Sequence, residues 1–157
     1  MLVTNRIRLR DVLEADLPIF YAHQLDPDAT RMAAFPSRPR DAFMAHWARV
    51  LANADNIKQT IVVDGQVAGN IGCFEQDGER QVGYWLGREY WGQGVATEAL
   101  MQFLAYVKIR PLYAHVVQHN IASRRVLEKC GFRVVCEVPG LPDATGAPVQ
   151  EFILILR

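Results

Sequence analysis

The sequence lacks an excess of charge of either sign, because 17 Lys and Arg residues balance 17 Asp and Glu residues. Without a global positive field, nucleic acid and anionic membranes are not expected as partners. The sequence also lacks any apolar run approaching the roughly 20 residues that span a bilayer. Residues 1–10 carry Arg6, Arg8 and Arg10 instead of an apolar targeting segment. We therefore expect a cytoplasmic protein.

Cysteine is scarce in the chain. The three cysteines, Cys73, Cys130 and Cys136, cannot all pair with one another, and no two of them form a C-x-x-C motif. This pattern indicates unpaired thiols in a reduced compartment.

Internal repeats, low-complexity tracts and linkers are also missing. Half of the 157 residues are hydrophobic, which is enough for a full core. The two proline-containing stretches, residues 35–40 and 139–148, are short enough to be loops. We expect a single domain over residues 1–157.

Hydrophobic periodicity predicts an alternation of strands and helices. Asp64-Gly65 suits a tight hairpin turn, which makes the flanking strands antiparallel. Pro111 ends the helix that follows Gly94, and Gly131 is a C-cap for the last helix. The predicted strands are 6–10, 60–63, 66–74, 80–86, 112–117, 132–138 and 150–156, and the predicted helices are 16–23, 41–53, 95–107 and 121–130.

The strand–helix–strand unit over residues 82–117 predicts a right-handed crossover between two parallel strands. The fold class is therefore α/β (α+β), a mixed, mostly antiparallel sheet of about seven strands with about four helices on its two faces. A strand that leads into a ligand loop can splay from its parallel neighbour and open a slot. The apolar strand 150–156 fits either a central place in the sheet or an edge that pairs in a dimer, so monomer and homodimer both stay open.

Glycines mark the start of the helix after strand 80–86. The segment Trp91-Gly92-Gln93-Gly94-Val95-Ala96 has no Ser, Thr, Asp or Asn to cap the first N–H groups of that helix, which suits a phosphate. An ordinary glycine-rich turn gives the same pattern. The segment has no lysine for a Walker loop, and it has Thr97 where a dinucleotide fingerprint has its third glycine.

Four motifs in order make a more specific pattern: Gly83-Tyr84-Trp85-Leu86, then Tyr90-Trp91-Gly92-Gln93-Gly94-Val95-Ala96-Thr97-Glu98-Ala99, then Asn120-x-x-Ser123, then Glu128-Lys129-x-Gly131-Phe132. Together they resemble the GNAT acetyltransferases, in the branch that acetylates the N-termini of ribosomal proteins. The resemblance covers the chain from the first strand to the C-terminal hairpin. It implies an N-acetyltransferase that moves an acetyl group from acetyl-CoA to a primary amine, without a metal.

By that resemblance the backbone N–H groups of residues 93–97 hold the pyrophosphate, strand 84–86 pairs with the pantetheine arm, and Asn120 and Ser123 lie near the sulfur. The coenzyme-binding residues that it implies are Tyr84, Trp85, Leu86, Trp91, Gly92, Gln93, Gly94, Val95, Ala96, Thr97, Asn120 and Ser123.

Catalytic candidates are fewer. A backbone N–H of the Tyr84-Trp85 strand can bind the developing oxyanion. Ser123, at a helix start, can protonate the leaving thiolate, and a local hydrogen bond at that helix start is the alternative. The family's usual acid, a tyrosine seven residues after the asparagine, is Leu127 here, and its usual base is Gln81. Glu79, on the same strand face as Gln81, is the candidate base, against the alternative of a solvated turn residue.

Other chemistries fit less well. His115 and His119 have metal-like spacing but no carboxylate or cysteine beside them in sequence. Neither Ser37 nor Ser123 lies in a Gly-x-Ser-x-Gly elbow. Because Gln81 and Leu127 replace the family's base and acid, an acyl-CoA-binding regulatory or scaffold domain is the alternative function.

The acceptor is the least determined part. The resemblance places it between residues 29–40 and 139–148, and the first of these segments contains Arg31, Arg38 and Arg40 with Phe35. These residues suit an acidic or aromatic acceptor, although exposed arginines are often only solvated. A small-molecule amine and a protein N-terminus both remain candidates.

Overall fold

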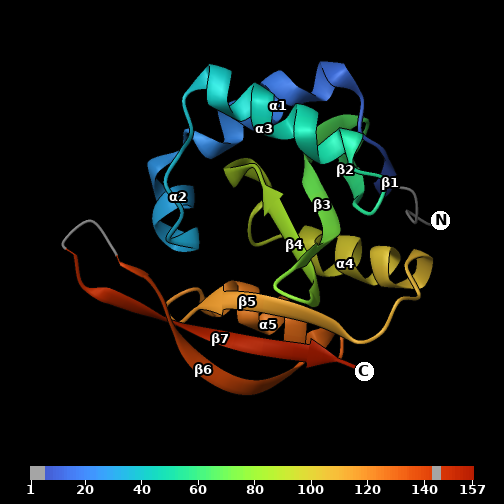
Figure 1. Cartoon of the computed structure of the whole chain (residues 1–157). Coiled ribbons are helices and arrows are strands. Elements are labelled where there is room, and N and C mark those ends of the chain that lie inside the picture. The colour runs from blue at the N-terminus through green and yellow to red at the C-terminus, as the bar shows by residue number, and fades with distance from the viewer. Residues whose placement is uncertain (1–5, 143–145) are drawn as a thin grey trace.

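A single mixed sheet forms the centre of the computed structural model, which describes residues 6–142 and 146–157. Its seven strands have the order β1-β2-β3-β4-β5-β7-β6 (Figure 1). The strands are β1 (Ile7–Asp11), β2 (Ile57–Val63), β3 (Gln66–Gln76), β4 (Glu79–Leu86), β5 (Leu112–Val117), β6 (Arg133–Pro142) and β7 (Pro148–Leu156).

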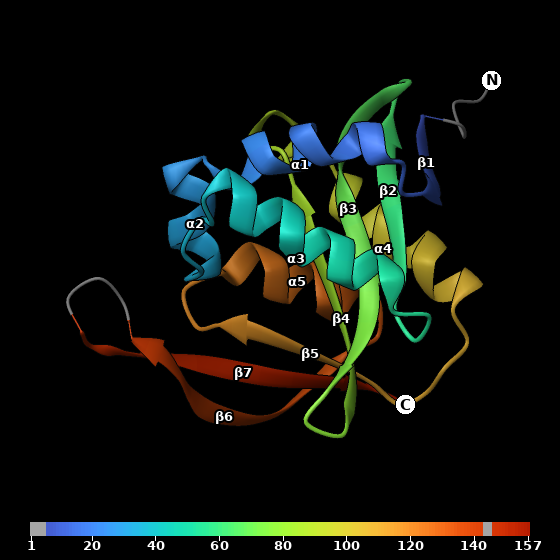
Figure 2. The same cartoon turned by 45° about the horizontal axis from the view of Figure 1, so that its top comes forward.

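Helices cover both faces of this sheet, as predicted (Figure 2). Leu17, Phe20, Phe43 and Trp47 of α1 and α3 form one apolar cluster over β3. The other face carries α4 and α5, whose apolar residues join the main core with those of the sheet. The helical segments are η1 (Glu14–Asp16), α1 (Leu17–Gln24), α2 (Pro27–Ala33), α3 (Arg40–Ala52), η2 (Arg88–Tyr90), α4 (Val95–Tyr106) and α5 (Ile121–Lys129), where η denotes a single 3-10 turn.

Two tight turns set the register of the β2–β3–β4 meander. Asp64 and Gly65 have φ angles of 50° and 81°, and Asp77 and Gly78 have φ angles of 53° and 79°. Two successive positive φ angles match the twist of the flanking strands, and Asp and Gly are among the residues that tolerate them best. The predicted antiparallel hairpins are therefore confirmed.

The β4–β5 pair is the one parallel pair in this sheet, and it is short. Its register consists of a single pair, Gln81 with Tyr113, whereas β4 pairs with β3 along its whole length. Beyond Gln81 the two strands diverge toward their C-terminal ends, as predicted for the splayed pair, and we call the region of divergence the slot (Figure 1). Parallel strands that part in this way leave a gap in the middle of the sheet.

The structure corrects the predicted helices at one place. Five α-helices occur within the described residues instead of about four, because α2 lies in the segment between the first two predicted helices. The predicted 35–40 loop is confirmed for residues 35–39, and Arg40 begins α3. Pro27–Ala33 forms α2, with Pro27 in its first turn and the Asp26 carboxylate accepting from the Asp28 N–H at 3.0 Å. An Asp N-cap followed by proline is a normal helix start, so the signal was present in the sequence.

The C-terminal hairpin is longer than predicted. β6 continues through Pro139 to Pro142 and β7 begins at Pro148, so residues 139–142 and 148 of the predicted 139–148 loop are strand. Proline is tolerated there because β6 is an edge strand. Residues 143–145 of that loop, and residues 1–5 of the predicted N-terminal stretch, lie outside the described residues.

The apolar strand β7 lies between β5 and β6 rather than at an edge. Its central position accounts for its composition, because both of its neighbours are strands of the same chain. None of the helices within residues 6–142 and 146–157 has the length and apolar character needed to cross a bilayer.

Candidate active site

A cavity of about 450 Å³ is enclosed by the C-terminal half of β4, the start of α4 and helices α2 and α5. Of the residues that the sequence predicted for coenzyme binding, only Gln93 is not part of its lining. Gln93 instead donates to the Glu89 carbonyl oxygen at 2.7 Å and accepts from Arg6 at 3.0 Å. The predicted residues that line the cavity are Tyr84, Trp85, Leu86, Trp91, Gly92, Gly94, Val95, Ala96, Thr97, Asn120 and Ser123.

The start of α4 opens into this cavity without a cap. Its N-cap residue is Gly94, and no side chain accepts from the first N–H groups of the helix. Gly92 and Gly94 have φ angles of 71° and 76°, and no heavy atom lies within 4 Å of the position where either would carry a Cβ. Free N–H groups, the positive end of a helix dipole and open space together fit a phosphate group.

Tyr84 and Ser123 meet across the slot, one from β4 and the other from α5. The Tyr84 hydroxyl donates to Ser123 Oγ at 3.1 Å, while Asn120 Oδ1 accepts from the Ser123 N–H at 3.2 Å. Burial raises the pKa of the Tyr84 phenol, against the lowering effect of its hydrogen bond to Ser123. Asn120 therefore caps α5, and the Ser123 hydroxyl is directed to Tyr84 rather than into a local bond.

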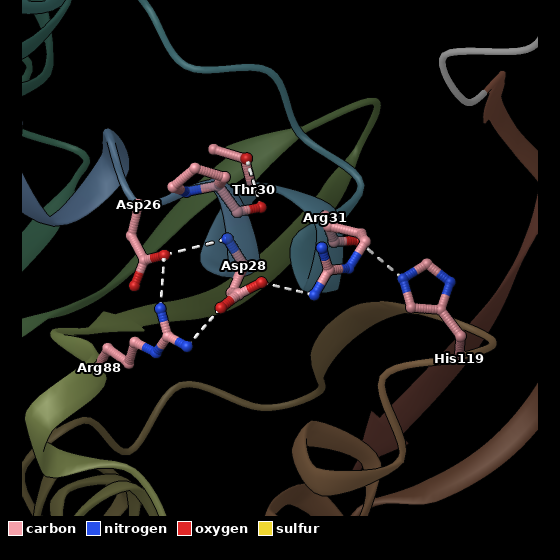
Figure 3. Close-up of polar contacts among 7 residues, drawn as sticks. Asp26, Asp28, Thr30, Arg31, Arg88 and His119 are labelled. Atoms are coloured by element: carbon pink, nitrogen blue, oxygen red, sulfur yellow. Dashed lines mark hydrogen bonds and ion pairs between the residues drawn. The ribbon is translucent and has the colours of Figure 1, made fainter.

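Helix α2 bridges the two sides of the slot, and Ala29, Met32 and Ala33 of this helix line the cavity. On the β4 side, Arg88 of η2 forms ion pairs with Asp26, at 3.4 Å, and with Asp28 (Figure 3). On the β5 side, His119 Nε2 donates to the Arg31 carbonyl oxygen at 2.8 Å (Figure 3).

Within α2 itself, Asp28 also pairs with the Arg31 guanidinium at 2.6 Å, and Thr30 Oγ1 donates to the Pro27 carbonyl oxygen at 3.0 Å (Figure 3). These contacts stabilise α2 close to the residues that Arg88 and His119 bind. Residues 29–40 were predicted to wall the acceptor site, but not as a helix; Ala29, Met32 and Ala33 of this segment line the same cavity as the predicted coenzyme-binding residues.

Two cations of α5, Arg125 and Lys129, also line the cavity and were not predicted. They are four residues apart, so they lie one turn from each other on the same helix face. Ala122, one turn before Arg125, lines the cavity as well. Residues 122, 125 and 129 have the spacing of one helix face, so the sequence could have indicated that Arg125 and Lys129 lie beside a polyanionic ligand.

Glu79, the predicted base, is not part of the cavity lining. Its Oε1 lies 3.2 Å from His115 Nε2 and accepts from Gln81 Nε2 at 3.4 Å, and His115 Nδ1 lies 3.3 Å from Glu151 Oε1. The side chains of Glu79, His115 and Glu151 are only 30%, 28% and 25% exposed. A neutral imidazole can donate to one of the two carboxylates and an imidazolium to both, so the group can hold a proton beside the point where β4 and β5 separate.

Leu127, His115 and His119 lie in three different environments. Leu127, at the position of the tyrosine that many GNAT enzymes use, is 3% exposed in the core and does not reach the cavity. His115 contacts Glu79 and Glu151, whereas His119 contacts Arg31. The H-x₃-H spacing thus leads to two different environments.

A family model described as the acetyltransferase (GNAT) domain matches residues 6–133. The chain belongs to the GNAT family. This family uses acetyl-CoA, and the protein is an N-acetyltransferase of the acyltransferase class. The uncapped helix start and the slot beside β4 are the features of this GNAT domain that fit the coenzyme.

Curated relatives and solved structures agree with this assignment. The uncharacterized N-acetyltransferase p20 of Bacillus licheniformis is 26% identical over 145 residues, which is 84% of this chain and 82% of p20. YdaF of Bacillus subtilis (strain 168), provisionally named a ribosomal N-acetyltransferase, is 26% identical over 100 residues, 59% of this chain and 55% of YdaF. The spermidine N-acetyltransferase of Vibrio cholerae, solved with CoA and spermine, shares the fold with a TM-score of 0.84 at 14% identity, covering 98% of this chain and 96% of that one.

Proposed function

We propose that acetyl-CoA lies in the cavity formed by β4, the start of α4, α2 and α5, and that its acetyl group passes directly to a primary amine in a ternary complex. One observation carries the proposal: the uncapped start of α4, with its two open glycine positions, faces the same cavity as the Tyr84–Ser123 pair. In this arrangement the N–H groups of Gln93, Gly94, Val95, Ala96 and Thr97 hold the pyrophosphate. Arg125 and Lys129 are placed to neutralise further phosphate charge.

In the proposed transfer the amine nitrogen attacks the thioester carbonyl carbon, so that a C–N bond forms and the C–S bond breaks. A backbone N–H of the Tyr84–Trp85 segment stabilises the negative charge that develops on the carbonyl oxygen. Ser123 gives its proton to the departing thiolate and takes the proton of the Tyr84 hydroxyl in its place, and Tyr84 regains a proton from water. Tyr84 donates to Ser123 Oγ, which allows the proton of Ser123 to point away from Tyr84 and toward the thiolate.

The proton that leaves the amine goes to the group formed by Glu79 and His115, through a water molecule. Glu79 and Gln81 alternate on β4 with Tyr84, so they face the side of the sheet opposite to Ser123. Their neighbour His115 is held by Glu151 on β7. The base and the acid therefore act from opposite faces of the sheet, and a protonated base does not meet the leaving thiolate.

A protein N-terminus and a small-molecule amine both present the primary amine that this chemistry needs. The motif resemblance to the ribosomal branch, and the provisional name of YdaF, support a protein N-terminus. The coenzyme site does not depend on which of the two is used.

The donor assignment is tested by thermal unfolding with acetyl-CoA, CoA, ATP and NAD in parallel. A ligand at ~100 times its Kd stabilises the native state by about 2.7 kcal/mol, so acetyl-CoA and CoA are expected to raise Tm clearly and ATP and NAD are not. If neither CoA nor acetyl-CoA shifts Tm, the donor site is wrong. A larger shift with ATP or NAD would indicate a nucleotide-binding module.

The base is tested by turnover with acetyl-CoA across a panel of amines. Glu79→Gln is expected to lower kcat on the order of 10²-fold, the usual contribution of a general base, without changing the acetyl-CoA Tm shift. Asp77→Asn, in the adjoining turn, is the matched control because it also removes one carboxylate near β4. Equal kcat values for Glu79→Gln and the wild type would exclude Glu79 as the base.

A further inference from the structure

A second cavity, of about 160 Å³, lies between the sheet and helices α1 and α3. Trp85 of β4 lines both this cavity and the larger one. The strand that borders the proposed donor site is thus shared with a pocket on the helix α1 and α3 side of the sheet. Among the described residues, Trp85 is the one that the linings of the two cavities share, so it is the contact between the smaller cavity and the proposed donor site.

The walls of this second cavity are aromatic and already in place. Phe20, Phe43 and Trp47 pack in the α1–α3 cluster, with ring centroids of Phe20 and Trp47 5.1 Å apart. The buried Gln24 side chain accepts from the Arg38 N–H at 2.6 Å and donates to the Arg38 carbonyl oxygen at 3.2 Å. This pair of bonds fixes the segment after α2 as one side of the cavity.

Lys58 of β2 brings a positive charge into the cavity. Its Nζ lies 5.4 Å from the Trp47 ring centroid and 5.5 Å from that of Phe74, and its stem packs against Gly72. Among the described residues no carboxylate comes within ion-pair distance of this ammonium, and no protein group accepts a hydrogen bond from it. Burial lowers the pKa of Lys58 to about 8, so the ammonium is still mainly charged at neutral pH.

The other charges near the cavity are also positive. The pKa of His46, a lining residue, is lowered first by burial and then by Arg38, Lys58 and Arg49. None of the residues that line this cavity is Asp or Glu. A partly buried cation without a counter-ion is costly, and a ligand carboxylate would remove that cost. A polycationic amine would meet only charges of its own sign here.

We propose that the acceptor is a small amine that carries a carboxylate, held in the second cavity with its carboxylate on Lys58 and its amine directed to β4 at Trp85. The inference rests on the acetyl transfer proposed above and chooses between its two candidate acceptors. The cationic lining of this cavity favours a small-molecule amine over the protein N-terminus that the resemblance to the ribosomal branch suggests. Aromatic walls suit an apolar side chain on the same molecule, as in an aromatic or branched amino acid. The negative charge of the acceptor distinguishes this class from two others. Polyamines carry only positive charge, and the first residue of a protein has an amide in place of the carboxylate.

The test compares three acceptors that differ only at the carboxylate: phenylalanine, phenylalaninamide and phenethylamine, each with acetyl-CoA. Spermidine and an alanine-initiated peptide are measured beside them. Phenylalanine is expected to have a kcat/KM at least about tenfold above the amide and the amine, as one hydrogen bond to a charged group provides. A higher kcat/KM for the amide, the peptide or spermidine would overturn the inference.

Lys58→Met keeps the length of the stem and removes the charge, and Lys108→Met at an exposed position is the matched control. Lys58→Met is expected to raise KM for phenylalanine about tenfold or more and to leave KM for phenethylamine unchanged. It is also expected to fold, because it removes an unpaired ammonium from a partly buried site. An unchanged KM for phenylalanine would contradict the role of Lys58.

Failure of the proposed function has a different signature. If neither acetyl-CoA nor CoA raises Tm, the donor site itself is wrong. If acetyl-CoA binds but no amine is turned over, the wild-type protein is titrated with phenylalanine and phenylalaninamide while Trp fluorescence is recorded, since Trp47 and Trp85 line the cavity. Binding of the acid alone supports the acceptor class, and binding of neither overturns it.

Discussion

The Tyr84 hydroxyl donates to Ser123 Oγ at 3.1 Å, from the strand on one side of the slot to the helix on the other. The two residues are 39 positions apart in the chain, and the crossover through α4 brings them together. Because the Ser123 N–H is already satisfied by Asn120, the hydroxyl is free for chemistry without loss of the α5 cap. The Ser123 hydroxyl can thus act in the cavity while Asn120 caps α5.

Replacing Ser123 tests this division of roles. We expect Ser123→Ala to lower kcat on the order of 10²-fold, since general acid catalysis contributes about that much, while Tm changes by no more than a few degrees because the Asn120 cap uses only backbone N–H. Single-turnover kinetics with saturating acetyl-CoA and thermal unfolding measure the two effects. Ser37→Ala, the other serine, is exposed and serves as control. An unchanged single-turnover rate would remove Ser123 from the mechanism.

Two glycines allow the phosphate loop to be tested apart from backbone strain. Gly94 and Gly65 have φ angles of 76° and 81°, and at both an added Cβ meets no heavy atom within 4 Å. Gly94→Ala and Gly65→Ala are each expected to cost about 1 kcal/mol of stability, because alanine is strained in the left-handed region.

Gly94→Ala alone is expected to weaken acetyl-CoA binding, by roughly tenfold, because its methyl group enters the space of the ligand. Calorimetric titration gives Kd and thermal unfolding gives the strain. If both variants bind acetyl-CoA as the wild type does, the space above Gly94 is not the coenzyme site.

The bridge through α2 predicts a dynamic effect without a large change in stability. Arg88→Gln removes the ion pairs to Asp26 and Asp28, and exposed pairs of this kind contribute only about 0–1 kcal/mol to global stability. The helix then keeps its His119 contact on one side only. We expect faster hydrogen exchange within residues 30–34 and a several-fold higher acetyl-CoA dissociation rate, since local opening costs less free energy than global unfolding.

Hydrogen-exchange mass spectrometry and stopped-flow displacement measure these two quantities. Arg8→Gln is the control, because Arg8 is an exposed β1 residue whose side chain makes no hydrogen bond or ion pair among the described residues. Equal exchange of α2 in both variants would show that the ion pairs do not hold the bridge.

Features of the fold that depend on neighbouring residues could be predicted from the sequence, whereas features that depend on contacts between distant segments could not. The Asp64-Gly65 turn and the Gly131 end of α5 depend on neighbouring residues only, and the sequence predicted both. Helix α2 was missed because seven residues are too few to show a helical period, although Asp26 and Pro27 mark its start. The continuation of β6 through Pro139 depends on an edge position that only the whole sheet defines, and Pro148 is tolerated because it is the first residue of β7.

The site divides in the same way. The glycine loop is a continuous segment, so its residues could be named in advance. The contacts of His115 with Glu79 and with Glu151 join three strands, and they depend on the register of β4 with β5 and of β5 with β7. The Lys58 cavity depends on α1, α3 and β2 packing together. No short-range pattern in the sequence carries this information.

Asp16 links the first strand to the α1–α3 layer and makes the stability of the fold depend on pH. Its carboxylate accepts from Arg10 at 2.7 and 3.0 Å, from the Leu13 N–H at 2.9 Å and from Thr60 Oγ1 at 2.7 Å. Burial alone would raise the pKa of Asp16, but these bonds and the Arg10 charge outweigh it and lower the pKa from 3.8 to about 2.

A carboxyl whose pKa is lower in the folded state stabilises that state above its unfolded pKa. The contribution of Asp16 is therefore complete above about pH 4 and is lost as the pH falls from about 4 to about 2. Asp16→Asn is expected to lower the free energy of unfolding at pH 7 on the order of 2 kcal/mol, and the difference from the wild type is expected to shrink below pH 4. Urea unfolding at a series of pH values measures it, with Asp55→Asn, an exposed carboxylate, as control. A deficit that stays constant from pH 7 to pH 3 would mean that Asp16 acts by its shape and hydrogen bonds rather than by its charge.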